Sequence, residues 1–172
     1  LRRPRLDPQQ LERLAGFVDG SLLETLAERA QLDRGTLSDV SAVVRRRLDW
    51  AAWRKKGGSG AERARTLHHR GQLDDAAVSD AIAWGERDFV VTALALLAGT
   101  GEEVVENILS HQSPKGITAL CWKAQLAMRT CRMLQFRIAR VPVMKVLSAR
   151  GGTDYPLPET DMRWQLEFYG VM

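Results

Sequence analysis

Signals that start and stop helices follow one another at short intervals along this chain, and they constrain its fold more than any other feature. Leu73 and Val78 flank Asp74 at the spacing of a hydrophobic staple, which predicts an N-cap and a helix over residues 75–85. Such signals divide the chain into roughly nine or ten short helices. We therefore expect an all-α fold.

The same signals give the bounds of individual helices. A capping box pairs Thr100 with Glu103, and Ser113 followed by Pro114 marks another start. A glycine-rich stretch predicts a flexible loop over residues 55–61. The expected helices cover residues 8–20, a segment opening at Ser21, and residues 75–85, 88–98, 101–111, 114–125, 128–140 and 142–149.

The composition agrees with one soluble domain over residues 1–172. Apolar residues make up 45% of the chain, which is enough to bury a core. No apolar run is long enough to cross a membrane. The chain begins at Leu1, so we expect a fragment of a longer protein. Its two cysteines lack the dense framework of a secreted domain and favour a cytoplasmic location.

An internal repeat indicates how the helices pack. When the chain is shifted by forty-one residues, positions 31–33 coincide with 72–74, and positions 38–39 coincide with 79–80. A period near forty built from helix pairs is typical of HEAT and armadillo repeats, in which each pair buries its apolar face against its neighbours. The pattern predicts a HEAT-like superhelix. An irregular helical bundle with the same apolar periodicity is the alternative.

Charge is segregated along the chain, although the net charge is only +4. Residues 74–111 carry one base and eight acids, whereas residues 112–150 carry eight bases and no acid. An acidic block therefore precedes a basic block. Because opposite charges attract across an interface, head-to-tail association between copies of the chain is one consequence of this order.

Two motifs in the C-terminal half resemble a known family. One is Leu-Cys-Trp-Lys-Ala at 120–124, and the other is a tail with Tyr-Pro-Leu-Pro-Glu at 155–159 and Met-Arg-Trp-Gln-Leu-Glu-Phe at 162–168. They are similar to a bacterial family of HEAT-like, all-helical domains of unknown function, and the likeness runs from about residue 73 to 168. The resemblance implies that fold and a cytosolic regulatory or scaffolding role. It supplies no catalytic residues.

The sequence contains no pattern of a catalytic, metal or nucleotide site. His68 and His69 are adjacent and point in different directions on a helix, and His111 stands alone. The spacings typical of zinc ligands and of phosphate-binding loops are missing. We therefore expect no metal and no cofactor, and we expect Cys121 and Cys131 to be buried, inert thiols.

The basic helix expected at 128–140 is the candidate binding surface. Projected as an α-helix, it separates an apolar stripe from a face rich in arginine. Phe136 lies among the arginines, where it can stack on a nucleic-acid base or anchor a protein interface. In the alternative interpretation, Met133 and Phe136 pack on a neighbouring helix pair and leave only solvated arginines. The stripe consists of Cys131, Leu134, Ile138 and Val141, and the candidate surface consists of Arg129, Arg132, Met133, Phe136, Arg137 and Arg140.

A second basic set precedes the glycine-rich stretch. If both sets share one concave face, a large anionic partner is expected through electrostatic steering and phosphate contacts. The second set consists of Arg45, Arg46, Arg47, Arg54, Lys55 and Lys56.

These observations favour a non-enzymatic interaction or scaffold module that holds a protein partner in a bacterial regulatory assembly. The alternative is a nucleic-acid-binding HEAT-like domain that uses its basic concave face. A third hypothesis is an enzyme whose acids include Asp154, Glu159 and Asp161. We expect no membrane insertion, and we expect copies of the chain to be able to associate.

Overall fold

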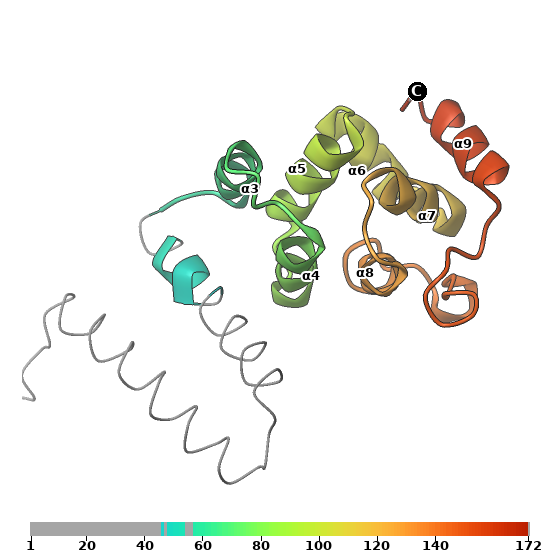
Figure 1. The fold of residues 1–172 in the computed structure, drawn as a ribbon, viewed down its shortest axis with the longest axis horizontal. Helices are drawn as coiled ribbons and strands as arrows, with labels where there is room; N and C mark the ends of the chain where they lie inside the picture. The colour runs from blue at the N-terminus through green and yellow to red at the C-terminus, as the bar shows by residue number, and fades with distance from the viewer. Residues whose placement is uncertain (1–45, 47, 54–56, 172) are drawn as a thin grey trace, which may run out of the picture. The chain divides into compact units, whose positions relative to one another are not determined.

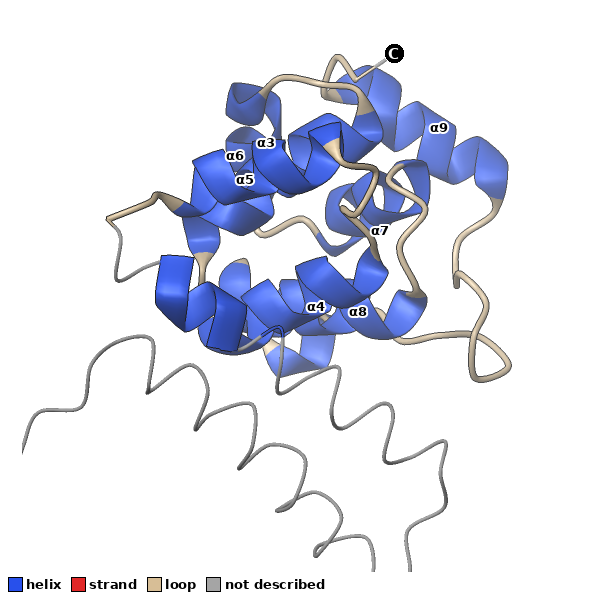
Figure 2. Cartoon of the chain, turned by 60° about the vertical axis from the view of Figure 1, so that its left-hand side comes forward, coloured by secondary structure: helices blue, strands red, loops and turns tan. Residues whose placement is uncertain are grey.

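The structure is a computed structural model that describes residues 46, 48–53 and 57–171. The chain divides into two compact units, residues 1–55 and 56–172, and each is described by itself. The described residues of the first unit are helical. Those of the second unit form helices joined by loops, most of them short, without a strand among them (Figures 1 and 2). The all-helical prediction is confirmed for the described residues, while the single domain over 1–172 stays a prediction.

The described elements of the second unit follow one another closely along the chain as far as η2, and residues 146–158 separate η2 from the last helix. None of these helices is long and apolar enough to cross a membrane. The expected helices at 8–20 and from Ser21 lie outside the described residues. The elements are α3 (Gly60–His69), α4 (Asp75–Trp84), α5 (Arg87–Ala98), α6 (Glu102–Ser110), α7 (Pro114–Lys123), α8 (Met128–Met133), the π-helical turn η1 (Leu134–Ile138), the 3-10 turn η2 (Val143–Lys145) and α9 (Glu159–Phe168).

The start of α4 confirms the staple that the sequence predicted. The Asp74 carboxylate accepts a hydrogen bond of 2.8 Å from the Ala77 amide, as an N-cap does. Leu73 and Val78 are both buried on either side of this cap. The helix ends at Gly85, whose φ of 74° places it in the left-handed region that favours glycine.

The predictions for the start of α6 and for the segment 142–149 are wrong. The N-cap of α6 is Gly101 and no side chain caps this helix, so the expected capping box of Thr100 and Glu103 does not form. The segment 142–149, expected to be a helix, contains only the turn η2. The side chain of the buried Gln135 binds the backbone of this segment at Leu147, in place of helical bonds.

Helix α5 forms the centre of the second unit. Apolar side chains cover it on all sides, and it contacts α3, α4, α6 and α7. A helix that is hydrophobic all round must be buried, which is the position that α5 takes in Figure 1. Phe89 is its largest fully buried side chain. The predicted helix at 88–98 is confirmed.

The close approach of α3 to α5 requires a glycine. A Cβ atom at Gly60 would lie 2.8 Å from the backbone nitrogen of Phe89, a distance that real Cβ atoms do not show. Ser59 caps α3, and Ser59 and Glu62 bond each other reciprocally in a capping box. Helix α3 therefore takes up the last part of the segment 55–61, for which the sequence predicted a flexible loop.

Helix α9 packs on α7 through a small apolar cluster of its own. Met162 and Leu166 are buried there against Ala119 of α7. In the sequence this region stood out only as a motif, and its helix was not predicted. The sequence analysis did not predict helix α3 either.

Candidate functional site

The basic helix begins at Met128 and continues from α8 into η1. Its N-cap, Ala127, has no side chain that could cap the helix. Asp75 in the first turn of α4 does so instead, since its carboxylate accepts hydrogen bonds of 2.8 Å from the Ala127 amide and 3.0 Å from the Thr130 hydroxyl. A residue 52 positions away thus fixes the start of this helix.

The helix ends in a π-helical turn. The Ala139 amide donates to the Leu134 carbonyl at 3.0 Å, five residues back, whereas an α-helix bonds four residues back. The helix therefore ends at Ile138 and not at the predicted Arg140, whose φ of 55° is left-handed. The predicted apolar stripe is confirmed as buried: Cys131, Leu134, Ile138 and Val141.

Gln135 is fully buried beside this stripe, and no sequence pattern singled it out. Its side-chain amide donates to the Leu147 carbonyl at 3.2 Å, and its side-chain oxygen accepts from the Leu147 amide at 2.9 Å. The amide also contacts the Cys131 sulfur at 3.4 Å. One side chain therefore holds the segment after η2 against the helix.

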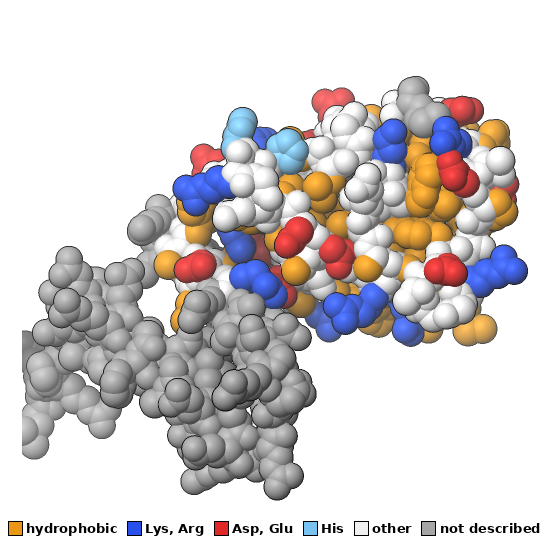
Figure 3. All heavy atoms as spheres, in the orientation of Figure 1, with side chains coloured by type: hydrophobic (Ala, Val, Ile, Leu, Met, Phe, Trp, Pro, Cys, Tyr) orange, Lys and Arg blue, Asp and Glu red, His pale blue; other side chains and the backbone are white. Residues whose placement is uncertain are grey.

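The helix and this segment enclose an open groove of about 450 Å³, which we call the arginine groove. Its lining is mostly apolar, with arginines among the apolar side chains. In Figure 3 lysine and arginine side chains lie along the lower edge of the second unit, below the place of α8 in Figure 1. The groove is lined by Arg129, Arg132, Met133, Phe136, Arg137, Val143, Val146 and Ser148.

The structure brings together five of the six candidate residues that the sequence placed on this helix, and Arg140 is the exception. Met133 is partly buried against the core, in agreement with the packing alternative. Phe136 is not, because 55% of it is exposed. Met144 next to the groove is 96% exposed. An exposed apolar surface with a charged margin is typical of an interaction site.

The arginines of the groove differ in what they contact. Arg137 donates a hydrogen bond of 3.2 Å to the Ala83 carbonyl in the last turn of α4. Arg129 and Arg132 form no ion pair with any carboxylate in the described part of the chain. Within the described residues, their charge is available to a partner.

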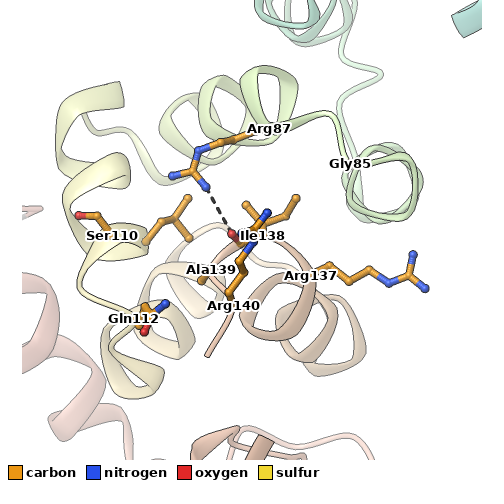
Figure 4. Close-up of a pocket in the computed structure, with 9 residues that line it drawn as sticks. Gly85, Arg87, Ser110, Gln112, Arg137, Ile138, Ala139 and Arg140 are labelled. Carbon is orange, nitrogen blue, oxygen red and sulfur yellow. Dashed lines mark hydrogen bonds between the residues drawn. The ribbon is translucent and has the colours of Figure 1, made fainter. Parts of the chain in front are cut away.

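A second pocket lies beside the groove, and we call it the helix-end pocket (Figure 4). Arg87 reaches across it, pairs with Glu106 and donates to the Ile138 carbonyl at 3.3 Å. Helix α4 ends in the C-cap Gly85, η1 ends in the C-cap Ala139, and α6 ends close to Gln112, so three helix ends line this pocket. The lining residues are Gly85, Arg87, Leu109, Ser110, Gln112, Arg137, Ile138, Ala139 and Arg140.

The second basic set cannot be assigned to the groove. Arg46 lies in a helix of the first unit and is half-buried. The predicted concave face shared by both sets requires the other members, which lie outside the described residues: Arg45, Arg47, Arg54, Lys55 and Lys56.

The two cysteines lie in the core and form no disulfide. The prediction that both are buried is confirmed. A hydrogen bond with the Cys131 thiol, together with burial, raises the pKa of Cys121 well above its usual value. Burial also raises the pKa of the nearby Tyr155, whose hydroxyl donates to the Leu126 carbonyl at 2.6 Å. The inertness of the thiols stays a prediction.

The remaining sequence candidates lie at the surface. Asp154, Glu159 and Asp161 are exposed, and Glu159 pairs with Arg163 one helical turn away. His68 and His69 are exposed at the end of α3. Among the described residues no three histidines, cysteines or acids are grouped so that they could hold a metal ion.

Comparison with known proteins supports one part of the resemblance, a bacterial family of unknown function, and gives a different range of residues. A family model of uncharacterised proteins conserved in bacteria (DUF2336) matches residues 1–159. The match includes the N-terminal third, which the motifs did not cover, and ends at the first residue of α9. Curated proteins gave no match, and solved structures gave none either. Because the family model covers most of the chain, the protein belongs to the DUF2336 family.

Proposed function

We propose that the protein is a non-enzymatic interaction module whose arginine groove binds an acidic, amphipathic segment of a protein partner in a bacterial regulatory system. One observation carries this proposal: Phe136 is exposed in an apolar groove beside Arg129 and Arg132, which lack carboxylate partners among the described residues. Aromatic and arginine side chains dominate the binding energy of protein interfaces.

The chemistry of the groove defines its partner. An amphipathic helix presents apolar anchors on one face, and these fill a hydrophobic groove. Acidic residues beside the anchors then face the guanidinium groups of Arg129 and Arg132. Such charge pairs accelerate association and select the partner more than they add affinity.

The wider architecture suits this role. We propose a cytoplasmic protein built as a HEAT-like superhelix of nine or ten helices, in which stacked helix pairs present an extended surface. The repeat near forty residues in the sequence supports this architecture. The absence of a recognisable catalytic pattern in the sequence leaves binding as the simplest role.

Nucleic acid is the competing ligand for the same surface. The run of eight bases without an acid over residues 112–150 and the aromatic ring of Phe136 are features of nucleic-acid sites. Phosphate backbones, however, gain little from the apolar wall that Met133, Val143 and Val146 give the groove. We therefore favour a protein partner and treat nucleic acid as an outcome of the test.

The test is fluorescence anisotropy with three kinds of labelled probe, at low and at physiological salt. The probes are an acidic amphipathic helical peptide, a peptide of equal charge without apolar residues, and short single-stranded and duplex DNA. We expect the amphipathic peptide to bind at physiological salt and the equal-charge peptide to bind at least about tenfold more weakly, a difference of about 1.4 kcal/mol.

Two variants make the test specific to the groove. Arg129→Glu/Arg132→Glu should weaken peptide binding by more than about tenfold. Lys115→Glu/Lys123→Glu makes the same change in net charge at exposed positions of α7 and should retain it. Binding of DNA alone, with a steep dependence on salt and loss in the groove variant, would replace this proposal with the nucleic-acid function.

A further inference from the structure

The outer face of α9 carries two exposed aromatic side chains. Trp164 is 60% exposed and Phe168 is 70% exposed. Their rings stack, with centroids 6.0 Å apart and an interplanar angle of 24°. Large aromatic side chains exposed side by side are typical of interface anchors.

The packing of α9 holds this aromatic pair in place. Met162 and Leu166 anchor the opposite face of the helix in the core. The ring of Tyr169 contacts Phe168 edge to face at a centroid distance of 5.1 Å. A partner therefore meets a surface that is already ordered, which lowers the entropic cost of binding.

The charges around the pair are acidic. Asp161 lies three residues before Trp164, and Glu167 lies three residues after it, the spacing at which side chains are neighbours on a helix. Both acids are exposed and form no ion pair in the described part of the chain. The guanidinium group of Arg163 is occupied, since it pairs with Glu159 and lies 5.9 Å from the Trp122 ring centroid.

The outer face of α9 thus has the chemistry that the arginine groove requires. We infer that the groove binds α9 of a second copy of this chain, with Trp164 and Phe168 in the apolar lining and the two acids opposite Arg129 and Arg132. This inference rests on the proposed function and names its partner. The groove is also large enough, since pockets of about 300–1,000 Å³ hold ligands of several rings.

The charges exclude contacts between two like faces. Two α9 faces in contact would bring four unpaired acids together, and two grooves in contact would bring their arginines together. Only a contact between the groove of one copy and α9 of another brings opposite charges together. Because every copy carries both surfaces, two copies can bind each other reciprocally, or the contact repeats from copy to copy and gives a ring or an open chain.

The test is sedimentation velocity of the whole chain over a range of concentrations. We expect the mass of the wild type to increase with concentration, and the increase to weaken with added salt. The groove variant Arg129→Glu/Arg132→Glu and the α9 variant Trp164→Ser/Phe168→Ser should each stay monomeric. All four positions are at the surface, and circular dichroism verifies that each variant is folded.

A mixture of the two variants gives the decisive result. One variant retains a working α9 and the other retains a working groove, so an equimolar mixture should form dimers and nothing larger. A wild type that stays monomeric at low salt overturns the inference, as does a mixture without dimers. Unchanged association of either variant alone also overturns it, whereas Lys115→Glu/Lys123→Glu should associate like the wild type.

The acidic amphipathic peptide separates this inference from the proposed function. If the α9 variant binds that peptide but does not dimerise with the groove variant, the groove has another protein partner and only the inference is wrong. If the α9 variant binds neither the peptide nor the groove variant, the proposed function is wrong as well.

Discussion

The arginine groove and the helix-end pocket are neighbours that share Arg137, yet their arginines have different roles. In the helix-end pocket, Arg87 binds a backbone carbonyl and a glutamate of the protein itself. In the groove, Arg129 and Arg132 contact no carboxylate in the described ranges. The number of arginines around a pocket therefore says little about ligand binding. What each guanidinium already contacts is decisive.

The largest effect is expected at Gln135, which supports the groove from behind. Replacing Gln135 with Leu keeps its volume but leaves the amide and carbonyl of Leu147 without their partner. We expect a loss of about 2–3 kcal/mol in unfolding free energy, because buried unpaired polar groups cost about 1–3 kcal/mol each. Peptide binding should fall with it, as measured by urea unfolding and anisotropy. Full stability with normal binding would show that the groove does not depend on this contact.

The second largest effect concerns binding alone. Arg129→Glu/Arg132→Glu should weaken binding of the acidic peptide by more than about tenfold, or about 1.4 kcal/mol. The melting temperature should remain close to that of the wild type, because surface substitutions usually change stability by less than about 0.5 kcal/mol. A large drop in melting temperature would mean that these arginines, like Arg87, have structural partners.

In the helix-end pocket we expect a substitution to lower stability and to leave peptide binding unchanged. Arg87→Met removes the hydrogen bond to the Ile138 carbonyl and the pair with Glu106. We expect a loss of about 1 kcal/mol in stability, because the pair is largely exposed and contributes little. Peptide binding should be unchanged in anisotropy measurements. Weaker binding without a change in stability would contradict the distinction between the two pockets.

The smallest effect should appear at the shared residue. Arg137→Met loses an exposed hydrogen bond to the Ala83 carbonyl and one side chain of the groove. We expect a loss of about 0.5 kcal/mol in unfolding free energy and roughly a two- to threefold loss of peptide affinity. The first is smaller than the stability loss of Arg87→Met, and the second is smaller than the affinity loss of Arg129→Glu/Arg132→Glu. Thermal melts and anisotropy of the same sample measure the two effects. An effect confined to one measurement would assign Arg137 to one pocket.

Local signals in the sequence predicted most of the fold in the described part. The staple around Asp74 and the proline after Ser113 gave the starts of α4 and α7 correctly, because both are decided by neighbouring residues. The start of α8 at Met128 was also predicted correctly, although its cap comes from Asp75 in another helix. The prediction for 142–149 failed because Gln135, which lies outside this segment, determines its backbone.

Of the two walls of the candidate groove, the sequence predicted only the one that the basic helix forms. The helical spacing of Arg129, Arg132 and Phe136 correctly predicted that these three side chains share one face. The opposite wall comes from a segment that looked helical in the sequence, so Val143 and Val146 were missed. The exposed aromatic pair of α9 was visible only as part of a motif, because no sequence pattern separates buried from exposed tryptophan.

The π-helical turn has a consequence for the way the groove can change. It accommodates one more residue than an α-helical turn, and Phe136 lies in the middle of it. Deleting a single residue between Leu134 and Ile138 would restore an ordinary helical turn, in which the residues after the turn keep their place and the residues inside it, Phe136 among them, point in new directions. The groove can therefore be lost through one deletion without any substitution of its lining. Gaps in this turn, rather than altered side chains, should distinguish family members that have the groove from those that lack it.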